Sequence, residues 1–600
     1  MFEGLKEIRR EIRESEFDGG DAELNKGYEL NFIGKSYAKY VATLPTETVL
    51  VPDTEWNERP DNKNSKNLFI TGDNLDALKH LINAYGGRVK MIYIDPPYNT
   101  GNDGFAYKDK YFFSDDDLKR IFHYSSDDIR RLRALDGKCS HSAWLTFMLP
   151  RLILGRRLLD DDGVIFISVD DNEQANLKLL CDEVFGAGNF VGAYLKQSKV
   201  GGGSDSKFIV KEHEYCITYV KYINFAKEMF IQHSSEYIKR YNEKDENGMF
   251  FWDTFARPGL KNPIIYDITA PDGSIIRNGW IHSEERFKKE YLSGDVRIIQ
   301  KRNGEWSVQF KQRLNEQGRK PRSMTMDFGG SIEGKNDILS LFGNEKIFLY
   351  PKSVKYISTL LSTISDKDAL ILDFFAGSAT TAHAVMQLNA ADGGNRRYIM
   401  VQSDEPCGEK SEAKKAGFDT VDEIGRERIR LAAEKTGDRS GFKHFKLAKV
   451  SDGAVLDKID TFDPTNKDLF AMDLIDAFSG ENLNAGLKAD GAATILATWM
   501  TDDGIPPTTE IETLDFAGYK AFMPKDSHRL YLIEKGWSSK ATKALLNFIG
   551  TDEKPIVQNV VVYLPSFGFK DLTELKNALG TALNAPMNAE ERFCAVSERI

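Results

Sequence analysis

The chain has 600 residues, of which 41% are hydrophobic and 28% are charged, and its formal net charge at pH 7 is −11. This length predicts several domains, and the composition is typical of a soluble globular protein. We find no run of eighteen apolar residues, which argues against a membrane-spanning helix, and the charged start lacks the apolar core of a signal peptide. Five scattered cysteines without a CxxC pair argue against a zinc site and favour a reducing, cytoplasmic location.

The first half of the chain alternates predicted strands with predicted helices. Residues 1–60 contain a short charged helix and end in a polar loop or linker. The strands that follow are expected at 68–73, 89–95, 163–170 and 213–222, and the helices at 74–85, 141–159 and 172–185. This alternation predicts βαβ units and a doubly wound, mostly parallel α/β sheet.

The alternation lapses between about residues 225 and 343 and then resumes. A helix is expected at 353–364, a strand at 369–377, a helix at 378–391 and a strand at 396–402. One sheet is therefore split by an insertion. The expected domains are an N-terminal segment (1–60), a catalytic half (61–225), an inserted domain (226–340), a second half of the sheet (341–450) and a mixed α+β C-terminal domain (451–600).

The stretch "MIYIDPPYNTGNDGF", which begins at Met91, ends a buried strand on a carboxylate. Asp95, Pro96, Pro97 and Tyr98 follow the apolar residues directly. A strand followed by an ordinary turn is the simplest interpretation, since Asp, Pro, Asn and Gly all favour turns.

A second motif, "LILDFFAGSATTAHAV", starts at residue 370 and predicts a strand, a sharp turn and a helix. Gly377 permits a tight turn, and the N–H groups at the start of the helix offer donors to an electronegative ligand. Asp373 at the strand end is suited to pair with a cationic amino group. In open parallel sheets ligands bind at the carboxyl ends of the strands, so we expect Asp95 and Asp373 to face one crevice.

Together the two motifs resemble those of the S-adenosylmethionine-dependent amino methyltransferases of DNA. "DPPY" (95–98) is similar to their catalytic motif and "DFFAGSATT" (373–381) to their cofactor motif, in the circularly permuted order of the beta class. "TGDNLDALKHL", "HEY", "RPGLKNP" and "YPKSVKYI" further resemble the modification (Mod) subunits of type III restriction systems. The resemblance implies a Rossmann-like fold that acts on DNA with S-adenosyl-L-methionine as cofactor.

The resemblance also implies roles for individual residues. The Asp95 carboxylate and the Pro96 carbonyl would accept hydrogen bonds from the target amine, and Tyr98 would stack on a flipped base. Asp73, either a cofactor contact or only a helix cap, joins a wider expected set of cofactor-binding residues. That set is Asp73, Asp95, Asp373, Phe374, Phe375, Ala376, Gly377, Ser378, Thr380, Thr381 and Gln402.

Two positions depart from the pattern of the family. Ala379 stands where a third glycine is commoner, and Gln402 stands where many relatives place an acid for the ribose, so Gln402, Asp404 and Glu405 are alternative ribose contacts. An Asp in the first position of the DPPY motif favours adenine N6 over cytosine N4 as the target. No metal ligands are apparent.

The insertion is the expected target recognition domain. Residues 257–325 contain 14 Lys and Arg against 8 Asp and Glu, an excess of six positive charges in an acidic protein. These basic residues interleave with aromatic and amide side chains, which suits phosphate contacts and reading of base edges in double-stranded DNA, although a solvated mixed-charge surface is the alternative. The candidate contacts are Arg257, Lys261, Arg302, Lys320 and Arg322.

The expected partners follow from the same resemblance. A type III Mod subunit would form a homodimer and carry a separate ATP-dependent restriction (Res) subunit, and this chain lacks the GxxxxGK[ST] motif needed to power translocation itself. The alternatives are an orphan methyltransferase without a nuclease and a DNA-binding specificity module without turnover. The intact motifs at 95–98 and 373–381 argue against the latter.

Overall fold

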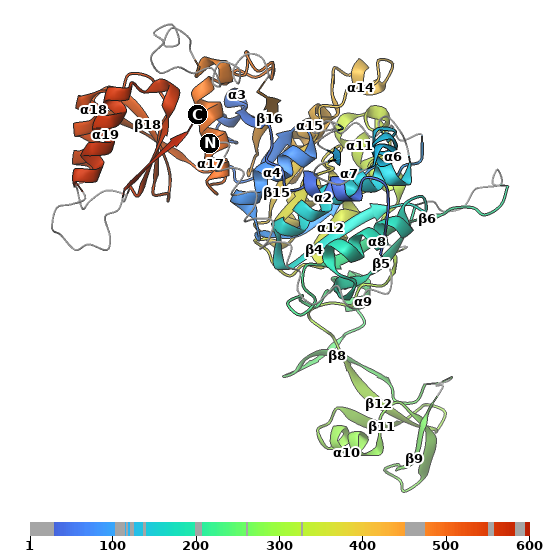
Figure 1. The fold of residues 1–600 in the computed structure, drawn as a ribbon. Helices are drawn as coiled ribbons and strands as arrows, with labels where there is room; N and C mark the ends of the chain where they lie inside the picture. The colour runs from blue at the N-terminus through green and yellow to red at the C-terminus, as the bar shows by residue number, and fades with distance from the viewer. Residues whose placement is uncertain are drawn as a thin grey trace. The chain divides into compact units, whose positions relative to one another are not determined.

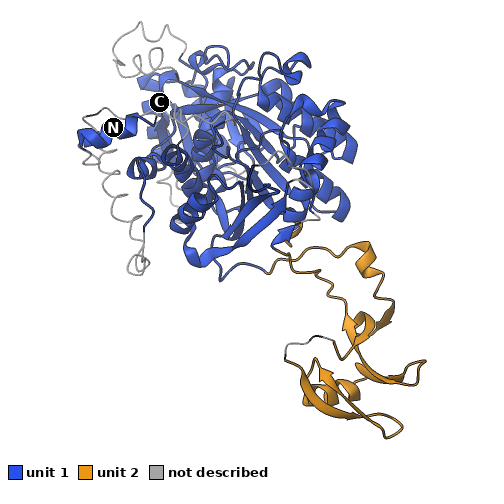
Figure 2. Ribbon diagram, turned by 90° about the vertical axis from the view of Figure 1, so that its right-hand side faces the viewer, with its two compact units in different colours: residues 1–227, 323–361, 366–600 blue, residues 228–322, 362–365 orange. Residues whose placement is uncertain are grey.

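The computed structural model describes residues 29–101, 115, 118–119, 125–135, 140–198, 207–257, 259, 262–325, 328–450, 474–549, 557–582 and 594–599. The chain divides into two compact units, which we describe separately (Figure 2). Unit 1 comprises 1–227, 323–361 and 366–600, and unit 2 comprises 228–322 and 362–365. Within the described ranges, no helix has both the length and the apolar character needed to cross a membrane. The helix predicted near the N-terminus lies outside the described residues.

A ten-stranded sheet forms the centre of unit 1 (Figure 1). In spatial order its strands are β1 (Thr48–Pro52), β16 (Lys443–Lys449), β2 (Leu68–Thr71), β15 (Arg397–Gln402), β14 (Leu370–Asp373), β3 (Val89–Ile94), β4 (Leu159–Val169), β6 (His213–Val220), β5 (Phe190–Gln197) and β13 (Met324–Thr325).

The order of these strands confirms the predicted doubly wound, Rossmann-like sheet. The strands from β16 through β2, β15, β14 and β3 to β4 are parallel, and β6 pairs antiparallel with both β4 and β5. β14 pairs with β3 through Ile371–Met91 and Leu372–Ile92, although 275 residues of chain separate the end of β3 from the start of β14. The strand that ends in the DPPY motif thus comes first in the chain and lies beside the strand that ends in "DFFAGSATT", the order expected for a circularly permuted sheet.

The central strands are buried on both faces. Ile70, Ile92 and Leu372 belong to one apolar cluster with side chains of the helices α4 and α7, whose bounds are given below. The alternate residues point the other way: the ring of Tyr93 contacts that of Tyr356, and Phe69 lies against Gly425. This alternation is the pattern of a parallel sheet covered by helices on both sides.

The helices of unit 1 agree closely with the predicted ones where the apolar period is strong. α4 (Asn74–Tyr85) and α7 (His141–Leu158) contact each other. α2 (Lys35–Val41) and α8 (Gln174–Phe185) pack against α7, and α17 (Gly491–Asp502) packs against α4. The remaining helices of the catalytic part are α3 (Thr54–Asn57), α6 (Ser126–Arg133), α11 (Ser331–Phe342), α12 (Val354–Ser362), α13 (Thr380–Asp392), α14 (Glu412–Lys415) and α15 (Val421–Thr436).

The C-terminal part of unit 1 has its own five-stranded sheet. It contains β17 (Ile511–Phe516), β18 (Tyr519–Pro524), β19 (Arg529–Leu532), β20 (Asn559–Tyr563) and β21 (Ala595–Arg599), with α18 (Ser539–Ile549) and α19 (Phe569–Ala582). α17 joins this part to the main sheet, since Thr498 accepts a hydrogen bond from the backbone N–H of Leu50 in β1.

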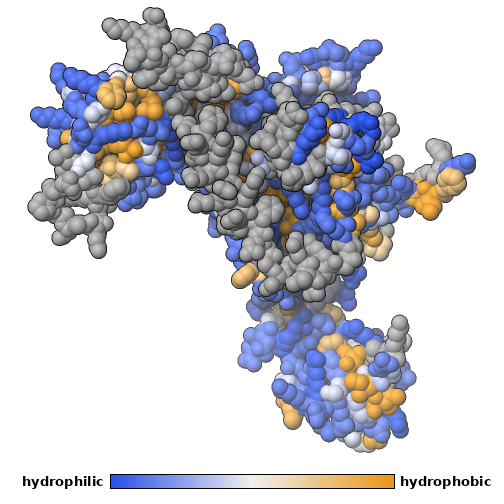
Figure 3. All heavy atoms as spheres, in the orientation of Figure 1, coloured by the Kyte–Doolittle hydropathy of each residue, from blue (hydrophilic) through white to orange (hydrophobic). Residues whose placement is uncertain are grey.

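Unit 2 is small and rich in antiparallel strands. Its elements are α9 (Ser235–Ile238), β7 (Glu243–Asp245), β8 (Gly248–Thr254), β9 (Ile264–Thr269), β10 (Ile275–Trp280), α10 (Glu284–Leu292), β11 (Val296–Gln300) and β12 (Trp306–Arg313). An aromatic cluster centred on Phe255, Trp280 and Phe310 forms its core. Exposed apolar side chains, Ile264, Ile265 and Ile275 among them, mark the β9–β10 hairpin on a mostly polar surface (Figure 3).

The observed limits of unit 2 differ from those predicted for the insertion. The sequence predicts an inserted domain over 226–340, whereas the compact unit ends at Arg322. The segment after it returns to unit 1, where β13 pairs with β5 and α11 contacts α15. Likewise, residues 48–52 of the predicted N-terminal segment form β1 and extend the main sheet.

Candidate active site

The DPPY stretch leaves β3 at its carboxyl end. Asp95 follows Ile94 directly, and the Tyr98 hydroxyl donates a 2.7 Å hydrogen bond to Oδ1 of Asp95. The indole N–H of Trp144 donates to the Pro97 carbonyl at 2.7 Å, which fixes the rigid Pro-Pro turn against α7. These contacts hold the Asp95 carboxylate and the Tyr98 ring side by side at the carboxyl end of β3.

The turn is anchored again one residue later. Asn99 has a left-handed backbone with φ of 58°, a conformation that asparagine tolerates better than most residues. Its side-chain amide donates a 2.6 Å hydrogen bond to the fully buried carboxylate of Glu173. The chain direction after Tyr98 is therefore set by a buried acid on the loop before α8.

The loop after β14 forms the second half of the site. Gly377 has φ of 51° and Ala379 has φ of 59°, so two of the three residues before α13 are left-handed. A Cβ at Gly377 would lie 3.3 Å from the ring of Phe348, and its conformation favours glycine. The loop backbone thereby closes tightly over the start of α13.

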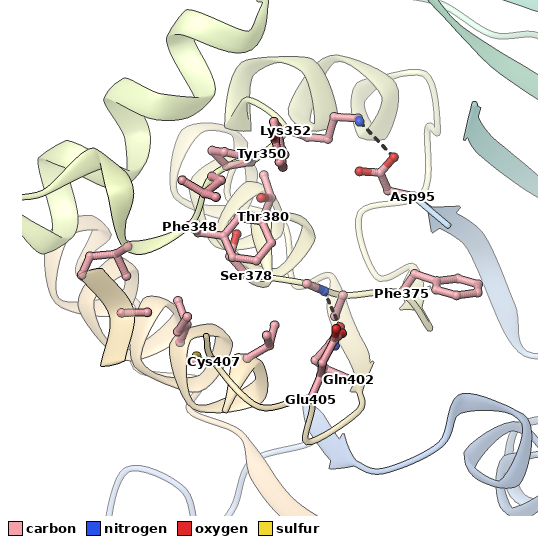
Figure 4. Close-up of a pocket in the computed structure, with 18 of the residues that line it drawn as sticks. Asp95, Phe348, Tyr350, Lys352, Phe375, Ser378, Thr380, Gln402, Glu405 and Cys407 are labelled. Carbon is pink, nitrogen blue, oxygen red and sulfur yellow. Dashed lines mark hydrogen bonds and ion pairs between the residues drawn. The ribbon is translucent and has the colours of Figure 1, made fainter. Parts of the chain in front are cut away.

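A cavity of about 700 Å³, the loop cavity, opens between this loop and the end of β3 (Figure 4). It is lined by residues of both motifs and by two further segments, around 346–352 and 402–413. The predicted site residues on its wall are Asp95, Pro96, Pro97, Asp373, Phe375, Ala376, Gly377, Ser378, Thr380, Thr381 and Gln402.

Asp373 is buried at the base of the loop cavity. Its Oδ2 accepts a 2.6 Å hydrogen bond from the Thr381 hydroxyl, and its Oδ1 accepts one from the backbone N–H of Phe375. Burial raises the pKa of Asp373 to about 7, because removal from water outweighs these two hydrogen bonds. A cationic group in the cavity would restore the charged form of this carboxylate.

The three alternative ribose contacts lie in different places. Gln402 and Glu405 line the loop cavity, whereas Asp404 is exposed and pairs with Lys446 at 3.2 Å. Oε1 of Gln402 accepts a 2.7 Å hydrogen bond from the backbone N–H of Gly377. Gln402 therefore also holds the glycine turn in place.

Two members of the predicted cofactor set do not line the loop cavity. Asp73 caps α4, with Oδ1 accepting from the backbone N–H groups of Leu75 and Asp76. Phe374 is fully buried within the apolar core, and its carbonyl accepts a 2.8 Å hydrogen bond from the side chain of Asn74. The structure therefore supports the role of Asp73 as the N-cap of α4. A contact of Asp73 or Phe374 with the cofactor stays a prediction.

A second cavity of about 550 Å³, the tyrosine cavity, adjoins the first. Asp95, Pro96, Pro97 and the segment 349–352 line both cavities, while Tyr98 lines the tyrosine cavity. Lys196 and Glu214 come to its wall from β5 and β6. The DPPY turn therefore forms the partition between two spaces.

Four charged side chains meet at this partition, namely Asp95, Lys196, Glu214 and Lys352. Of these four, the sequence predicted only Asp95 as a site residue. Lys352 pairs with Asp95 at 2.9 Å and with Glu214 at 3.5 Å, and Lys196 lies 3.7 Å from Glu214. Burial lowers the pKa of Lys352, but the two carboxylates outweigh this effect and its pKa lies above the ordinary value. Glu214 and Lys352 fall within the quoted stretches "HEY" and "YPKSVKYI", but nothing in these stretches marks them as site residues, and only the fold places them beside Asp95.

Arg428 supports the glycine loop from beneath. Its side chain is fully buried and donates 2.7 Å hydrogen bonds to the hydroxyls of Ser378 and Thr380. Burial lowers the pKa of this guanidinium to about 10, so it stays charged at neutral pH. A buried cation there fixes the two hydroxyls that border the loop cavity.

The predicted DNA contacts all fall within residues 228–322 of unit 2. Lys261 is not among the residues that the structure describes. Arg257 pairs with Asp253 at 3.0 Å, and Lys320 pairs with Glu228 at 2.6 Å. Arg302 and Arg322 are exposed. Among the described residues, no group of three or more His, Cys, Asp or Glu side chains is arranged to hold a metal ion.

Comparison with known proteins identifies the class that this fold and site define. A family model described as a DNA methylase matches residues 89–412, which include both motifs, and a second, described as the type III R-M EcoP15I C-terminal domain, matches residues 490–587. The chain is therefore a DNA methyltransferase, an enzyme whose methyl donor is S-adenosyl-L-methionine.

Full-length relatives define the family more narrowly. The chain is 40% identical to the type III restriction-modification enzyme StyLTI Mod subunit of Salmonella typhimurium, covering 95% of this chain and 90% of that protein. It is 35% identical to the EcoPI Mod subunit of Escherichia phage P1 and 34% identical to the EcoP15I Mod subunit of Escherichia coli, each covering 94% of this chain and 91% of the relative. The chain belongs to the Mod subunits of type III restriction-modification enzymes.

Proposed function

We propose that this Mod subunit methylates the N6 amino group of adenine at a specific sequence in double-stranded DNA. The observation that carries the proposal is the Asp95–Tyr98 pair at the wall between the two cavities. The loop cavity suits the cofactor, and the tyrosine cavity suits a base that has left the duplex. The Asp in the first position of the DPPY motif favours adenine N6 over cytosine N4.

The wall of the loop cavity fits S-adenosyl-L-methionine on two observations. The buried Asp373 has a pKa raised to about 7, so a cationic amino group beside it would be favourable. The glycine turn leaves space that a side chain at Gly377 would take. We assign Asp373 to the amino group, the 375–381 loop to the backbone of the ligand, and Gln402 or Glu405 to the ribose.

The chemistry follows from the groups around Asp95. An aryl amine is a poor nucleophile because its lone pair is delocalised into the ring. Hydrogen bonds from the amine to the Asp95 carboxylate and the Pro96 carbonyl would draw its nitrogen towards tetrahedral geometry and localise the lone pair. When bound, S-adenosyl-L-methionine supplies the methyl group, so that an N–C bond forms while the C–S bond breaks with its electron pair on sulfur. The surplus proton leaves the nitrogen towards Asp95.

The target atom can be tested directly. The purified chain is incubated with tritiated S-adenosyl-L-methionine and genomic DNA, and the hydrolysed nucleosides are separated by chromatography. Label in N6-methyladenine supports the proposal, and label in N4-methylcytosine contradicts it. Long-read sequencing of the same DNA then reports the recognition sequence.

We assign sequence recognition to unit 2. Its exposed Arg302 and Arg322 and the basic excess of residues 257–325 suit contacts with phosphates and base edges. Arg257 and Lys320 are already paired with acids in the unbound chain, so their use on DNA would require exchange of these ion pairs. Lys261 completes the proposed set.

The assembly we propose is a Mod homodimer that carries a separate ATP-dependent Res subunit, in the bacterial cytoplasm where the host DNA lies. We assign a subunit interface to the C-terminal domain, in which residues 490–587 match a type III C-terminal domain. Light scattering at micromolar concentration measures the mass of the free chain. A strictly monomeric and fully active protein would remove the dimer, and the absence of a neighbouring helicase–nuclease gene would favour an orphan methyltransferase.

A further inference from the structure

Lys352 lies at the junction of the loop cavity and the tyrosine cavity, and lines both of them. Its side chain is only 11% exposed, although it carries a full positive charge. The ammonium nitrogen lies 2.9 Å from Oδ1 of Asp95, 2.8 Å from the Tyr98 hydroxyl and 3.5 Å from Oε2 of Glu214. An ammonium group has three N–H donors, and three oxygen atoms surround this one.

The arrangement determines which oxygen atom of Asp95 stays accessible. Among the residues that the structure describes, the Tyr98 hydroxyl and the Lys352 ammonium both approach Oδ1 of Asp95. Oδ2 is thereby left for the amino group of a substrate. The same ammonium contacts the Tyr98 oxygen, which fixes one end of the aromatic ring that would stack on the base.

Glu214 balances the charge of this cluster. Without it, Lys352 and Lys196 would bring two positive charges to a largely buried space that holds one carboxylate. Burial raises the pKa of Glu214, but the positive charges of Lys352 and Lys196 outweigh this effect, so the pKa lies below its ordinary value. The cluster contains two lysines and two carboxylates, so its formal charges balance. A buried cluster of this kind is sensitive to removal of any one partner.

Several other titratable groups face Asp95 and enter any account of its charge. They come from β3 and its turn, from β14, β5 and β6, and from the segment before α12: Tyr93, Tyr98, Asp373, Lys196, Glu214, Cys216 and Lys352. Of these groups, only the two lysines are cations. Lys352 is the one in direct contact with the Asp95 carboxylate.

We propose that Lys352 is a positioning residue for methyl transfer, which orients the Asp95 carboxylate and the Tyr98 ring and is itself held by Glu214. The proposal rests on the proposed adenine methylation. It differs from a structural role of Lys352 because it places the charge of this residue in direct contact with the carboxylate that would bind the amine. Removal of this positive charge should shift the pH dependence of methyl transfer in one direction, and removal of the negative charge of Glu214 should shift it in the other.

The test compares four variants, Lys352→Met, Lys352→Arg, Glu214→Gln and the double variant Lys352→Met/Glu214→Gln, with the unaltered chain. We expect Lys352→Met to lower kcat by about 100- to 1000-fold, the range found when one electrostatic contact at a reacting group is removed, with the cofactor Kd changed less than about threefold. The acidic limb of the pH profile of kcat/KM should move to higher pH in Lys352→Met. It should move to lower pH in Glu214→Gln.

Two variants separate charge from geometry. Lys352→Arg keeps the charge, so its acidic limb should stay in place while kcat falls, because the planar guanidinium cannot reproduce the three contacts. The double variant removes one charge of each sign and should return the acidic limb towards its original position without restoring kcat. Lys355→Met is the matched control, since Lys355 is exposed and lies three residues after Lys352, in the first turn of α12.

The outcomes are distinct. If Lys352→Met retains kcat within threefold and an unmoved acidic limb, the proposal is wrong. If Lys352→Met does not fold, an unmoved acidic limb in Glu214→Gln overturns it equally. A failure of the unaltered chain to methylate adenine would instead contradict the proposed function, and the variants are compared only after that activity is established.

Discussion

The backbone N–H of Gly377 donates a 2.7 Å hydrogen bond to the side chain of Gln402, across the ends of the neighbouring strands β14 and β15. A residue expected to bind the ribose is therefore also a support of the glycine turn. An acid in its place would accept the same hydrogen bond with one oxygen atom and keep the other free. The amide of Gln402 offers an N–H group there instead.

Replacement of Asp95 or Tyr98 by Ala should abolish methyl transfer, with a loss of at least about 1000-fold in kcat, because both side chains serve the base. The affinity for S-adenosyl-L-methionine should stay within tenfold, since Asp373 and the 375–381 loop lie on the far side of the partition. Radiolabel transfer and calorimetry measure the two effects. Asp171→Ala is the control, because Asp171 follows the neighbouring strand β4 and pairs with Lys211. Near-normal turnover in Asp95→Ala would contradict the catalytic assignment.

Replacement of Gly377 by Val should weaken cofactor binding by at least tenfold. The branched side chain would meet the Phe348 ring, and the φ of 51° is unfavourable for a β-branched residue. Calorimetry on the folded variant measures the affinity. Gly393→Val has the same kind of substitution at a left-handed glycine that follows α13, away from the cavity, and should leave affinity unchanged. If Gly377→Val binds S-adenosyl-L-methionine as tightly as Gly393→Val and the unaltered chain, the turn at Gly377 has only a structural role.

Binding of S-adenosyl-L-methionine should tighten about fivefold between pH 6 and pH 7, below the range in which the amino group of the ligand loses its proton. The pKa of Asp373 in the unliganded chain is raised from 3.8 to about 7, so the carboxylate is mostly protonated at pH 6 and about half ionised at pH 7. A cationic ligand group binds the ionised form. Asp373→Asn should bind weakly at both pH values, and calorimetric titrations at a series of pH values compare the two proteins. A pH-independent affinity in the unaltered chain would refute the contact.

The same ionisation predicts the sign of a stability change. Between pH 3.8 and about 7 the folded chain holds a proton on Asp373 that the unfolded chain has lost, so this group makes the unliganded protein less stable as pH rises through that window. Its favourable contribution is fully present below pH 3.8 and is lost above pH 7. Asp373→Asn removes this dependence, which denaturant unfolding at several pH values would detect.

Replacement of Ala379 by Gly should raise the free energy of unfolding by about 1 kcal/mol, because Ala379 has φ of 59° and the left-handed conformation is costly for residues with a Cβ. Denaturant unfolding of both proteins without ligand measures the change. Ala382→Gly, inside α13, is a control with the opposite expected sign, since glycine in a helix interior costs about 1 kcal/mol. A destabilised Ala379→Gly variant would show that the methyl group packs more favourably than its backbone conformation costs.

Exchange of residues 228–322 for those of another Mod subunit should change the methylated sequence while N6 methylation continues. The exchanged segment has its own aromatic core, and Asp95 and Asp373 lie outside it. Long-read sequencing of methylated DNA reports the new recognition sequence. A chimera with the original sequence preference would place recognition elsewhere in the chain.

The sequence predicted the central sheet well because its strands and helices have strong apolar periods. The predicted helix 74–85 coincides with α4, which is capped at both ends by recognisable residues, Asp73 and Gly86. The strands β1 and β16 were not predicted, since β1 has only five residues and the seven residues of β16 have mixed polarity, so neither carries a clear periodic signal. Their pairing depends on contacts between residues about 400 positions apart in the chain.

The site was predictable where motifs are continuous and not where they are assembled by the fold. Asp95 and Tyr98 are three residues apart, so their pairing follows from a local turn. Lys352 reaches the same carboxylate from 257 positions further along the chain. Nothing in the local sequence around "YPKS" distinguishes this lysine from an exposed one, and only the β14–β3 pairing brings the segment to the site.

Unit 2 leaves the main body of the chain after Lys227 and returns at Ser323, and neither catalytic motif lies between these positions. A recombination event with both crossover points near these residues would replace residues 228–322 in one step. Under the proposed role of unit 2, the methylase and its nuclease partner would then acquire the same new target together, because both read DNA through this one segment. New specificities could thus arise in a bacterial lineage without a period in which the host genome is cut at unprotected sites.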